Sequence, residues 1–271
     1  MDSDLLPFFH LWFRRTVGGR MDPYQANLIH RILEGGTGFI INKARRTGIS
    51  TTVAVCALSA ALFKRMNVLV FSNSKDNAAF ILERSNWFLR VLREMQGAAG
   101  FQIPEMTTDK IQRIGFRGGG EVRSFAASPE TVRGYDADLI FFDEFAHLQG
   151  ERDLDKKMWQ AILPMKGLSD APVVVLSTPG PVGNLFWEHW FDAPEEKKIT
   201  IHWTECPRLV KTIRVEEQPF GKVYWIGDER FDEALFQQEF CNRFDPGYGP
   251  IIPLEALEAS EDPESEPWEM E

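Results

Sequence analysis

The sequence lacks the features of a disulfide-rich, zinc-binding or membrane-spanning protein. Its 271 residues include only three cysteines (Cys56, Cys206 and Cys241), which are widely separated and odd in number. Neither a disulfide framework nor a metal-ligand pair is indicated, and we expect a reducing, cytoplasmic setting. No apolar run approaches the roughly 18 residues that suggest a transmembrane helix. Acids precede the apolar stretch at the N-terminus, which is the wrong order for a secretory signal.

A net positive charge is also lacking, because 40 acidic residues outnumber 30 basic ones and the formal net charge is −10. The excess lies at the C-terminus, where eight of the seventeen residues from Glu255 to Glu271 are acidic and none is basic. Without this tail, 32 acidic residues face 30 basic ones. A nearly neutral body can still carry a local basic surface, so the composition does not decide whether the protein binds nucleic acid.

Short apolar runs alternate with longer stretches of helical periodicity. We expect strands at residues 38–44, 68–74, 121–128, 138–144, 172–178 and 198–205, and helices at 21–33, 50–65, 76–96 and 231–244. Nearly continuous apolar strands that alternate with helices are typical of a mostly parallel sheet covered on both faces. The sequence therefore predicts an α/β domain. An amphipathic segment at 5–20 precedes it, and the acidic tail is expected to be flexible.

The most informative stretch, GFIINKARRTGISTT, runs from a strand through a short loop into a helix. Gly48 permits a turn that aims backbone N–H groups at phosphate oxygens, and Ser50 stands where a hydroxyl can ligate Mg²⁺. The sequence departs from G-x-x-x-x-G-K-[ST], because Ile49 occupies the lysine position. Lys43 is the obvious substitute, and Arg45 and Arg46 add charge. An ordinary strand–turn–helix with solvated basic residues is the alternative.

Two further strands end in residues suited to nucleotide chemistry. The run Leu139 to Phe142 leads into Asp143 and Glu144, the form of a Walker B strand, in which the first carboxylate holds Mg²⁺ and the second polarises a water. The next strand ends in Ser177 and Thr178, at the edge where ligands bind in open α/β sheets. For the acidic pair the alternative is a buried strand that ends in solvated acids. For Ser177 and Thr178 it is a plain strand-to-turn transition, since Pro179 and Gly180 are turn residues.

The motifs DPYQ, KARRTGIST, TVRGYDADLIFFDE and VVLSTPG, in this order, resemble the ATPase domain of tailed-phage large terminases from about residue 20 to 250. The resemblance implies a three-layer P-loop NTPase fold of the additional-strand, RecA-like type. It also implies an ATP-hydrolysing motor that drives double-stranded DNA into a procapsid. The displaced lysine is a variant that this family uses.

The resemblance also implies a role for each matching residue. The residues that would bind the phosphates are Lys43, Arg46, Thr47, Gly48, Ser50 and Thr51. The residues that would ligate Mg²⁺ are Ser50 and Asp143. Adenine recognition falls to Gln25, beside which Tyr24 could stack on the base. Glu144 would be the catalytic base, Arg45 would touch the γ-phosphate, and Ser177, Thr178 and Pro179 would form the coupling motif. Arg133, eleven residues before Glu144, matches an arginine finger that acts on a neighbour's ATP, or else pairs locally with Asp136 or Asp138.

The partners implied are double-stranded DNA, the portal protein and procapsid, the small terminase subunit and copies of the chain itself. A pentameric ring is the family expectation, and a monomer is the alternative for the isolated chain. The place of action is the host cytoplasm, at the portal. Arg113, Arg117 and Arg123 are weak candidates for DNA contact.

We expect an ATPase domain over residues 1–206, a helical or linker subdomain over 207–250 and a tail over 251–271. The family's nuclease domain has no counterpart in this pattern, so we expect no DNA cleavage by this chain. Two alternatives remain: a helicase-type translocase, which would need a second RecA-like domain, and a nucleotide-binding scaffold that has lost catalysis.

Overall fold

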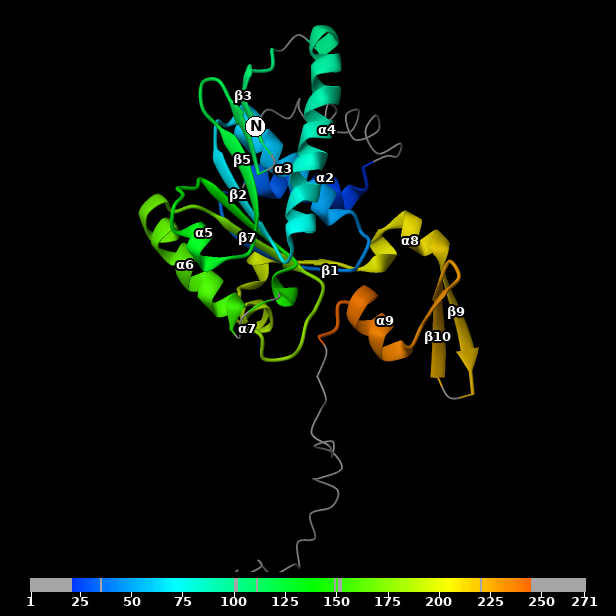
Figure 1. Ribbon diagram of the computed structural model, residues 1–271. Coiled ribbons are helices and arrows are strands. Elements are labelled where there is room, and N and C mark those ends of the chain that lie inside the picture. The colour runs from blue at the N-terminus through cyan, green and yellow to red at the C-terminus, as the bar shows by residue number, and fades with distance from the viewer. Residues whose placement is uncertain are drawn as a thin grey trace, which may run out of the picture.

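The computed structural model describes residues 21–34, 36–99, 102–110, 112–148, 150, 153–219 and 221–244. Its centre is an eight-stranded sheet in the order β3-β4-β5-β2-β6-β7-β1-β8 (Figure 1). The segment at 5–20 and the tail at 251–271 lie outside the described residues.

Six strands of the sheet run parallel, and they are the six that the apolar runs predict. Their bounds are β1 Phe39–Lys43, β2 Asn67–Ser72, β5 Glu121–Ala126, β6 Leu139–Asp143, β7 Val173–Ser177 and β8 Lys198–Ile201. The sequence did not predict β3 (Met106–Lys110) and β4 (Arg113–Phe116), which add an antiparallel hairpin at one edge. Strand β3 is mostly exposed and polar, so it carries no apolar run that would mark it.

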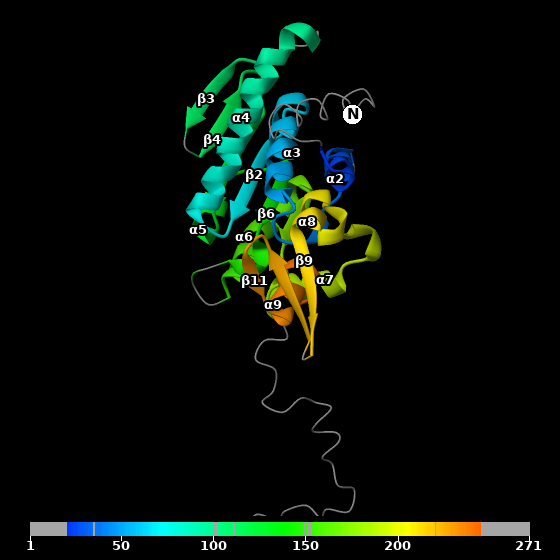
Figure 2. The ribbon, with the colours of Figure 1, turned by 90° about the vertical axis from the view of Figure 1, so that its right-hand side faces the viewer.

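Helices cover both faces of the sheet, as the nearly continuous apolar strands predict (Figures 1 and 2). One face packs against α2 (Pro23–Glu34), α3 (Ile49–Phe63) and α4 (Lys75–Ala99), and the other against α5 (Pro129–Val132), α6 (Leu154–Ser169) and α7 (Leu185–Asp192). Successive residues of a strand point to opposite faces of the sheet. Val68 and Val70 pack in the core on the α2–α4 face, and Leu69 and Phe71 pack in the core on the α5–α7 face. Within the described ranges, no helix is long and apolar enough to cross a bilayer.

Strand β7 lies between β1 and β6, which is the additional strand of the expected fold. Because these strands are parallel, their carboxyl ends meet at one edge of the sheet. The register places Asn42 beside Ser177, and Asp143 beside both Ser72 and Leu176. The polar residues that the sequence singles out therefore share this edge. Short 3-10 turns follow β6 at Phe145–His147 (η1) and β8 at Trp203–Glu205 (η3), and a third precedes β8 at Glu195–Lys197 (η2).

The region after residue 206, expected to be a helical or linker subdomain, forms a small unit that contains strands as well as helices. It comprises α8 (Pro207–Thr212), a three-stranded antiparallel sheet of β9 (Ile213–Gln218), β10 (Gly221–Ile226) and β11 (Glu229–Phe231), and α9 (Glu233–Phe240). Helix α9 is the helix predicted at 231–244. The unit has its own core, in which the rings of Tyr224 and Phe236 stack 3.8 Å apart. Strand β9 buries only Ile213, so its sequence lacks the alternation of apolar and polar residues that would predict a strand.

Two glycines in the turn between β4 and β5 differ in the space around them. Gly118 and Gly120 both have positive φ, but a Cβ on Gly120 would lie 2.1 Å from the carbonyl oxygen of Ala61, whereas a Cβ on Gly118 would meet open space. Left-handed backbone costs an L-residue about 1–2 kcal/mol, and the overlap with backbone adds about 1–3 kcal/mol. Gly120→Ala should therefore lower the free energy of unfolding in urea clearly more than the matched control Gly118→Ala. Equal losses would contradict the packing.

Candidate active site

The loop between β1 and α3 has the backbone of a phosphate-binding turn. Arg46 (φ 61°) and Gly48 (φ 77°) both adopt the left-handed conformation, which turns the chain sharply before α3 begins at Ile49. Gly48 suits this conformation because it has no Cβ, and a Cβ there would lie 3.2 Å from Nε2 of Gln25. The turn leaves the amino end of a fifteen-residue helix facing the carboxyl edge of the sheet. Such an end attracts anions.

Side chains from α2 hold this loop from behind. Tyr24 donates its hydroxyl to the carbonyl of Thr47 (2.6 Å), and Gln25 donates its amide to Oγ1 of Thr52 (3.1 Å) and the carbonyl of Gly48 (3.4 Å). Gln25 is buried, and its Oε1 accepts from the N–H of Asp22. Thr47 is buried and closes the loop by donating its Oγ1 to the carbonyl of Ala44 (2.8 Å). Gln25 and Tyr24 thus support the loop in this structure, and adenine contact remains a prediction for both.

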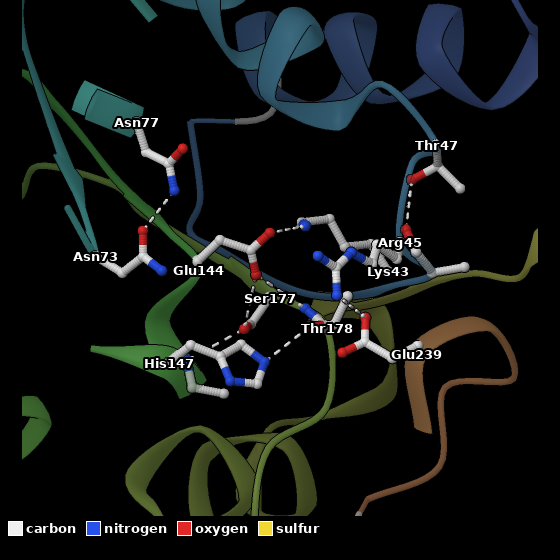
Figure 3. Close-up of polar contacts among 12 residues, drawn as sticks. Lys43, Arg45, Thr47, Asn73, Asn77, Glu144, His147, Ser177, Thr178 and Glu239 are labelled. Carbon is white, nitrogen blue, oxygen red and sulfur yellow. Dashed lines mark hydrogen bonds and ion pairs between the residues drawn. The ribbon is translucent and has the colours of Figure 1, made fainter. Parts of the chain in front are cut away.

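Lys43 is the last residue of β1, and its ammonium lies buried at the sheet edge (Figure 3). Its Nζ is 2.6 Å from Oε1 of Glu144. Burial opposes the charged form, but the carboxylates of Glu144 and Asp143 outweigh it and raise the pKa of Lys43. The lysine therefore carries its charge although it is buried. Ile49, which stands at the usual lysine position, is 2 % exposed and packs in the core.

The two carboxylates after β6 lie in different environments. Burial, reinforced by the charge of Glu144, raises the pKa of Asp143 to about 6, although Lys43 and a hydrogen bond with Ser50 oppose the rise. Burial acts on Glu144 in the same direction, but Lys43 overrides it and lowers the pKa of Glu144. Glu144 has left-handed backbone (φ 58°), which is costly for this residue type, and is only partly buried. One ammonium thus faces two carboxylates, and the site carries excess negative charge.

The segment after β7 contacts the second oxygen of Glu144. The hydroxyl of Ser177 and the N–H of Thr178 each lie 3.5 Å from its Oε2. Ser177 also accepts a hydrogen bond from the N–H of Ala146 (3.2 Å), and Oγ1 of Thr178 lies 2.8 Å from Nε2 of His147. Two of the three predicted coupling residues, Ser177 and Thr178, therefore contact the predicted base directly (Figure 3). His147 is not among the predicted site residues.

Helix α9 reaches the same edge, which the sequence did not predict. Arg45 donates its backbone N–H to the carbonyl of Glu239 (2.7 Å), and its guanidinium pairs with the Glu239 carboxylate (3.2 Å; Figure 3). Gln238 donates its amide to the carbonyl of Pro179 (3.0 Å). From α8, Arg208 donates to the carbonyl of Arg46 (2.7 Å). The C-terminal unit therefore contacts both the phosphate loop and the coupling segment.

The remaining predicted arginines lie elsewhere. Arg133 is exposed at the end of α5 and, with Lys157 and Gln160 of α6, lines a surface pocket. Asp138, one of its two predicted local partners, accepts instead from the N–H of Asn67 (2.8 Å). Arg113 and Arg123 share the carboxylate of Glu121, and Arg117 pairs with Glu105. These three arginines face two carboxylates, so most of their charge is balanced locally, which weakens the case for DNA contact.

Comparisons with known proteins agree with this geometry. The family model "Terminase large subunit, T4likevirus-type, N-terminal" matches residues 40–238. The ATPase domain of the large terminase of Thermus phage P74-26 is 19 % identical, with a TM-score of 0.58 over 86 % of this chain and 97 % of that domain. The large terminase of bacteriophage HK97 is 20 % identical, with a TM-score of 0.54 over 68 % of this chain and 39 % of that protein.

These solved structures share the fold of the sheet and its helices, and the family model spans both the phosphate loop and the acidic strand end. With the lysine, the acidic pair and the coupling residues gathered at one edge of an additional-strand sheet, the chain belongs to the large-terminase family, as a representative of its N-terminal ATPase domain.

Proposed function

We propose that this chain is the ATP-hydrolysing motor of phage genome packaging, which couples ATP hydrolysis to the translocation of double-stranded DNA through the portal into a procapsid. The buried Lys43–Glu144 pair, at the carboxyl edge of the sheet, is the observation that supports this function best. The motor would act in the host cytoplasm at the portal, as a homo-oligomeric ring that works with the small terminase subunit.

The β- and γ-phosphates of ATP would lie on the loop from Lys43 to Thr51. The backbone N–H groups of the loop and the amino end of α3 favour phosphate oxygens, and Lys43 supplies the cation that the standard pattern places in the loop. Arg45 would exchange the Glu239 carboxylate for phosphate. Because its guanidinium is largely exposed, this exchange costs little.

The donor set at the edge fits Mg²⁺. Oδ1 of Asp143 is buried and makes no hydrogen bond to any residue that the structure describes, and the hydroxyl of Ser50 lies close enough to lower the pKa of this carboxyl. Carboxylate and hydroxyl oxygens are hard ligands of the kind that Mg²⁺ takes. When bound, the ion would neutralise charge on the phosphate oxygens.

Glu144 would act as the general base on the attacking water. Its left-handed backbone directs the carboxylate toward Lys43 rather than along the strand, and its lowered pKa keeps it ionised at neutral pH. While it pairs with Lys43 its basicity is suppressed. The ammonium would turn to the phosphates when ATP binds, which would free Oε1 to accept a proton.

Removal of the base should separate binding from turnover. Glu144→Gln should lower steady-state ATP hydrolysis with Mg²⁺ by about 100-fold or more, while ATP still raises the unfolding temperature. Lys43→Ala should lose both the hydrolysis and the ATP-induced shift. Glu229→Gln, on the exposed edge strand β11, is the matched control and should behave as wild type. A Lys43→Ala variant that hydrolyses at the wild-type rate would refute the assignment of this lysine.

Asp143 should destabilise the metal-free protein. Its charge is buried and only partly balanced by Lys43, so Asp143→Asn should raise the free energy of unfolding in EDTA by about 1–3 kcal/mol. Mg²⁺ with ATP should stabilise the wild type and should have little effect on the variant. Asp136→Asn, an exposed aspartate, should change neither value. Equal stability and equal Mg²⁺ response of Asp143→Asn and wild type would argue against the metal site.

The exposed position of Arg133 suits an action on a neighbouring subunit. If it supplies charge to the neighbour's phosphates, the ATPase activity per mole of protein should rise with protein concentration, since the complete site forms only on assembly. Arg133→Ala should remove the rise, and Arg93→Ala, an exposed arginine of α4, should keep it. Activity that is independent of concentration in the wild type would exclude the role in trans.

A further inference from the structure

His147 lies one short turn after Glu144. The 3-10 turn η1 begins directly after the glutamate, and the N–H of His147 donates to the Glu144 carbonyl (2.9 Å). Phe145, 1 % exposed, anchors this turn in the core, where its ring meets Phe142 edge-on at 5.0 Å. The anchored turn holds the imidazole at the site (Figure 3).

The imidazole fixes a hydroxyl of the coupling segment. Nε2 of His147 lies 2.8 Å from Oγ1 of Thr178, which is itself buried. A threonine hydroxyl can donate or accept here, whichever the imidazole tautomer requires, so this contact restrains the Thr178 side chain and, with it, the backbone N–H that faces Glu144. The same turn binds Ser177 through the N–H of Ala146. The turn η1 thus contacts both hydroxyl residues at the carboxyl end of β7, Ser177 through Ala146 and Thr178 through His147.

These two hydroxyl residues lie on the side of Glu144 opposite Lys43. Lys43 holds Oε1 at 2.6 Å, whereas the backbone N–H of Thr178 and the hydroxyl of Ser177 approach Oε2 only to 3.5 Å. Hydrogen bonds of that length are weak, so the ammonium dominates this arrangement. Once Lys43 turns to phosphate, Glu144 loses its short contact. Thr178 and Ser177 are then the groups that determine where the carboxylate sits, and His147 holds one of them.

We propose that His147 is a positioning residue for Glu144 that acts through Thr178 and keeps the carboxylate aligned with the attacking water after Lys43 has left it. This inference rests on the hydrolysis proposed above. His147 itself touches neither the phosphates nor the water. Its removal affects the rate of the chemical step and leaves nucleotide affinity unchanged.

The test compares kcat and KM for Mg·ATP across a small set of variants of the whole chain. His147→Ala should lower kcat by about 10- to 100-fold, which is the scale of a misplaced catalytic group, with KM unchanged. His147→Gln places an amide nitrogen near the position of Nε2 and should recover most of the activity. Thr178→Val should match His147→Ala. The double variant should be no slower than either single variant, because both remove the same contact.

His30→Ala is the matched control, since His30 is an exposed residue of α2 that pairs only with Glu34 among the described ion pairs, and it should leave kcat unchanged. A wild-type kcat in His147→Ala, a purely KM effect, equal losses in His147→Ala and His147→Gln, or multiplicative losses in the double variant would each overturn the proposal. An inactive wild type, alongside an equally inactive Glu144→Gln, would instead refute the proposed function together with this inference.

Discussion

The ion pair between Lys43 and Glu144 is the contact around which the site is organised. It joins the ends of β1 and β6 across the end of β7, three strands that enter the sheet from distant parts of the chain. A buried pair of this kind contributes little net stability, because desolvation of both charges offsets their attraction. Its role is to keep the buried Lys43 ammonium ionised, because the neighbouring carboxylates raise its pKa. The ammonium can then leave these carboxylates for the more highly charged phosphates of a nucleotide.

Much of this arrangement could be predicted because each element that carries chemistry has a local signature. A buried parallel strand is a continuous apolar run, and the residue that ends it lies at the ligand-binding edge. Asp143, Glu144, Ser177 and Thr178 are predicted in this way, and Lys43 is predicted as the substitute for the lysine that the phosphate-loop pattern lacks at Ile49. The additional-strand fold came from the family resemblance, and the sheet confirms it, with β7 between β1 and β6.

What could not be predicted has no local signature. The edge strands β3 and β9 are exposed and polar, so they lack both the apolar run and the alternation that mark a strand. Glu239 reaches Arg45 from almost two hundred residues away, and half of that contact runs between backbone atoms, which carry no residue identity. The Asn42–Asn242 pair ties the end of α9 to β1 by similar reciprocal bonds. Such contacts follow from the packing of the C-terminal unit, which only the assembled fold reveals.

The burial of Ile49 bears on how such sites can be found at all. It opens helix α3, in which twelve of fifteen residues are buried, and it lies where the conventional loop has its lysine. A helix enclosed on all sides accommodates an apolar first residue more easily than an ammonium, and the cation at the end of β1 makes that choice possible. A search for the pattern G-x-x-x-x-G-K-[ST] would miss this chain. A search for a basic residue at the end of one buried strand and two acids at the end of another would find it.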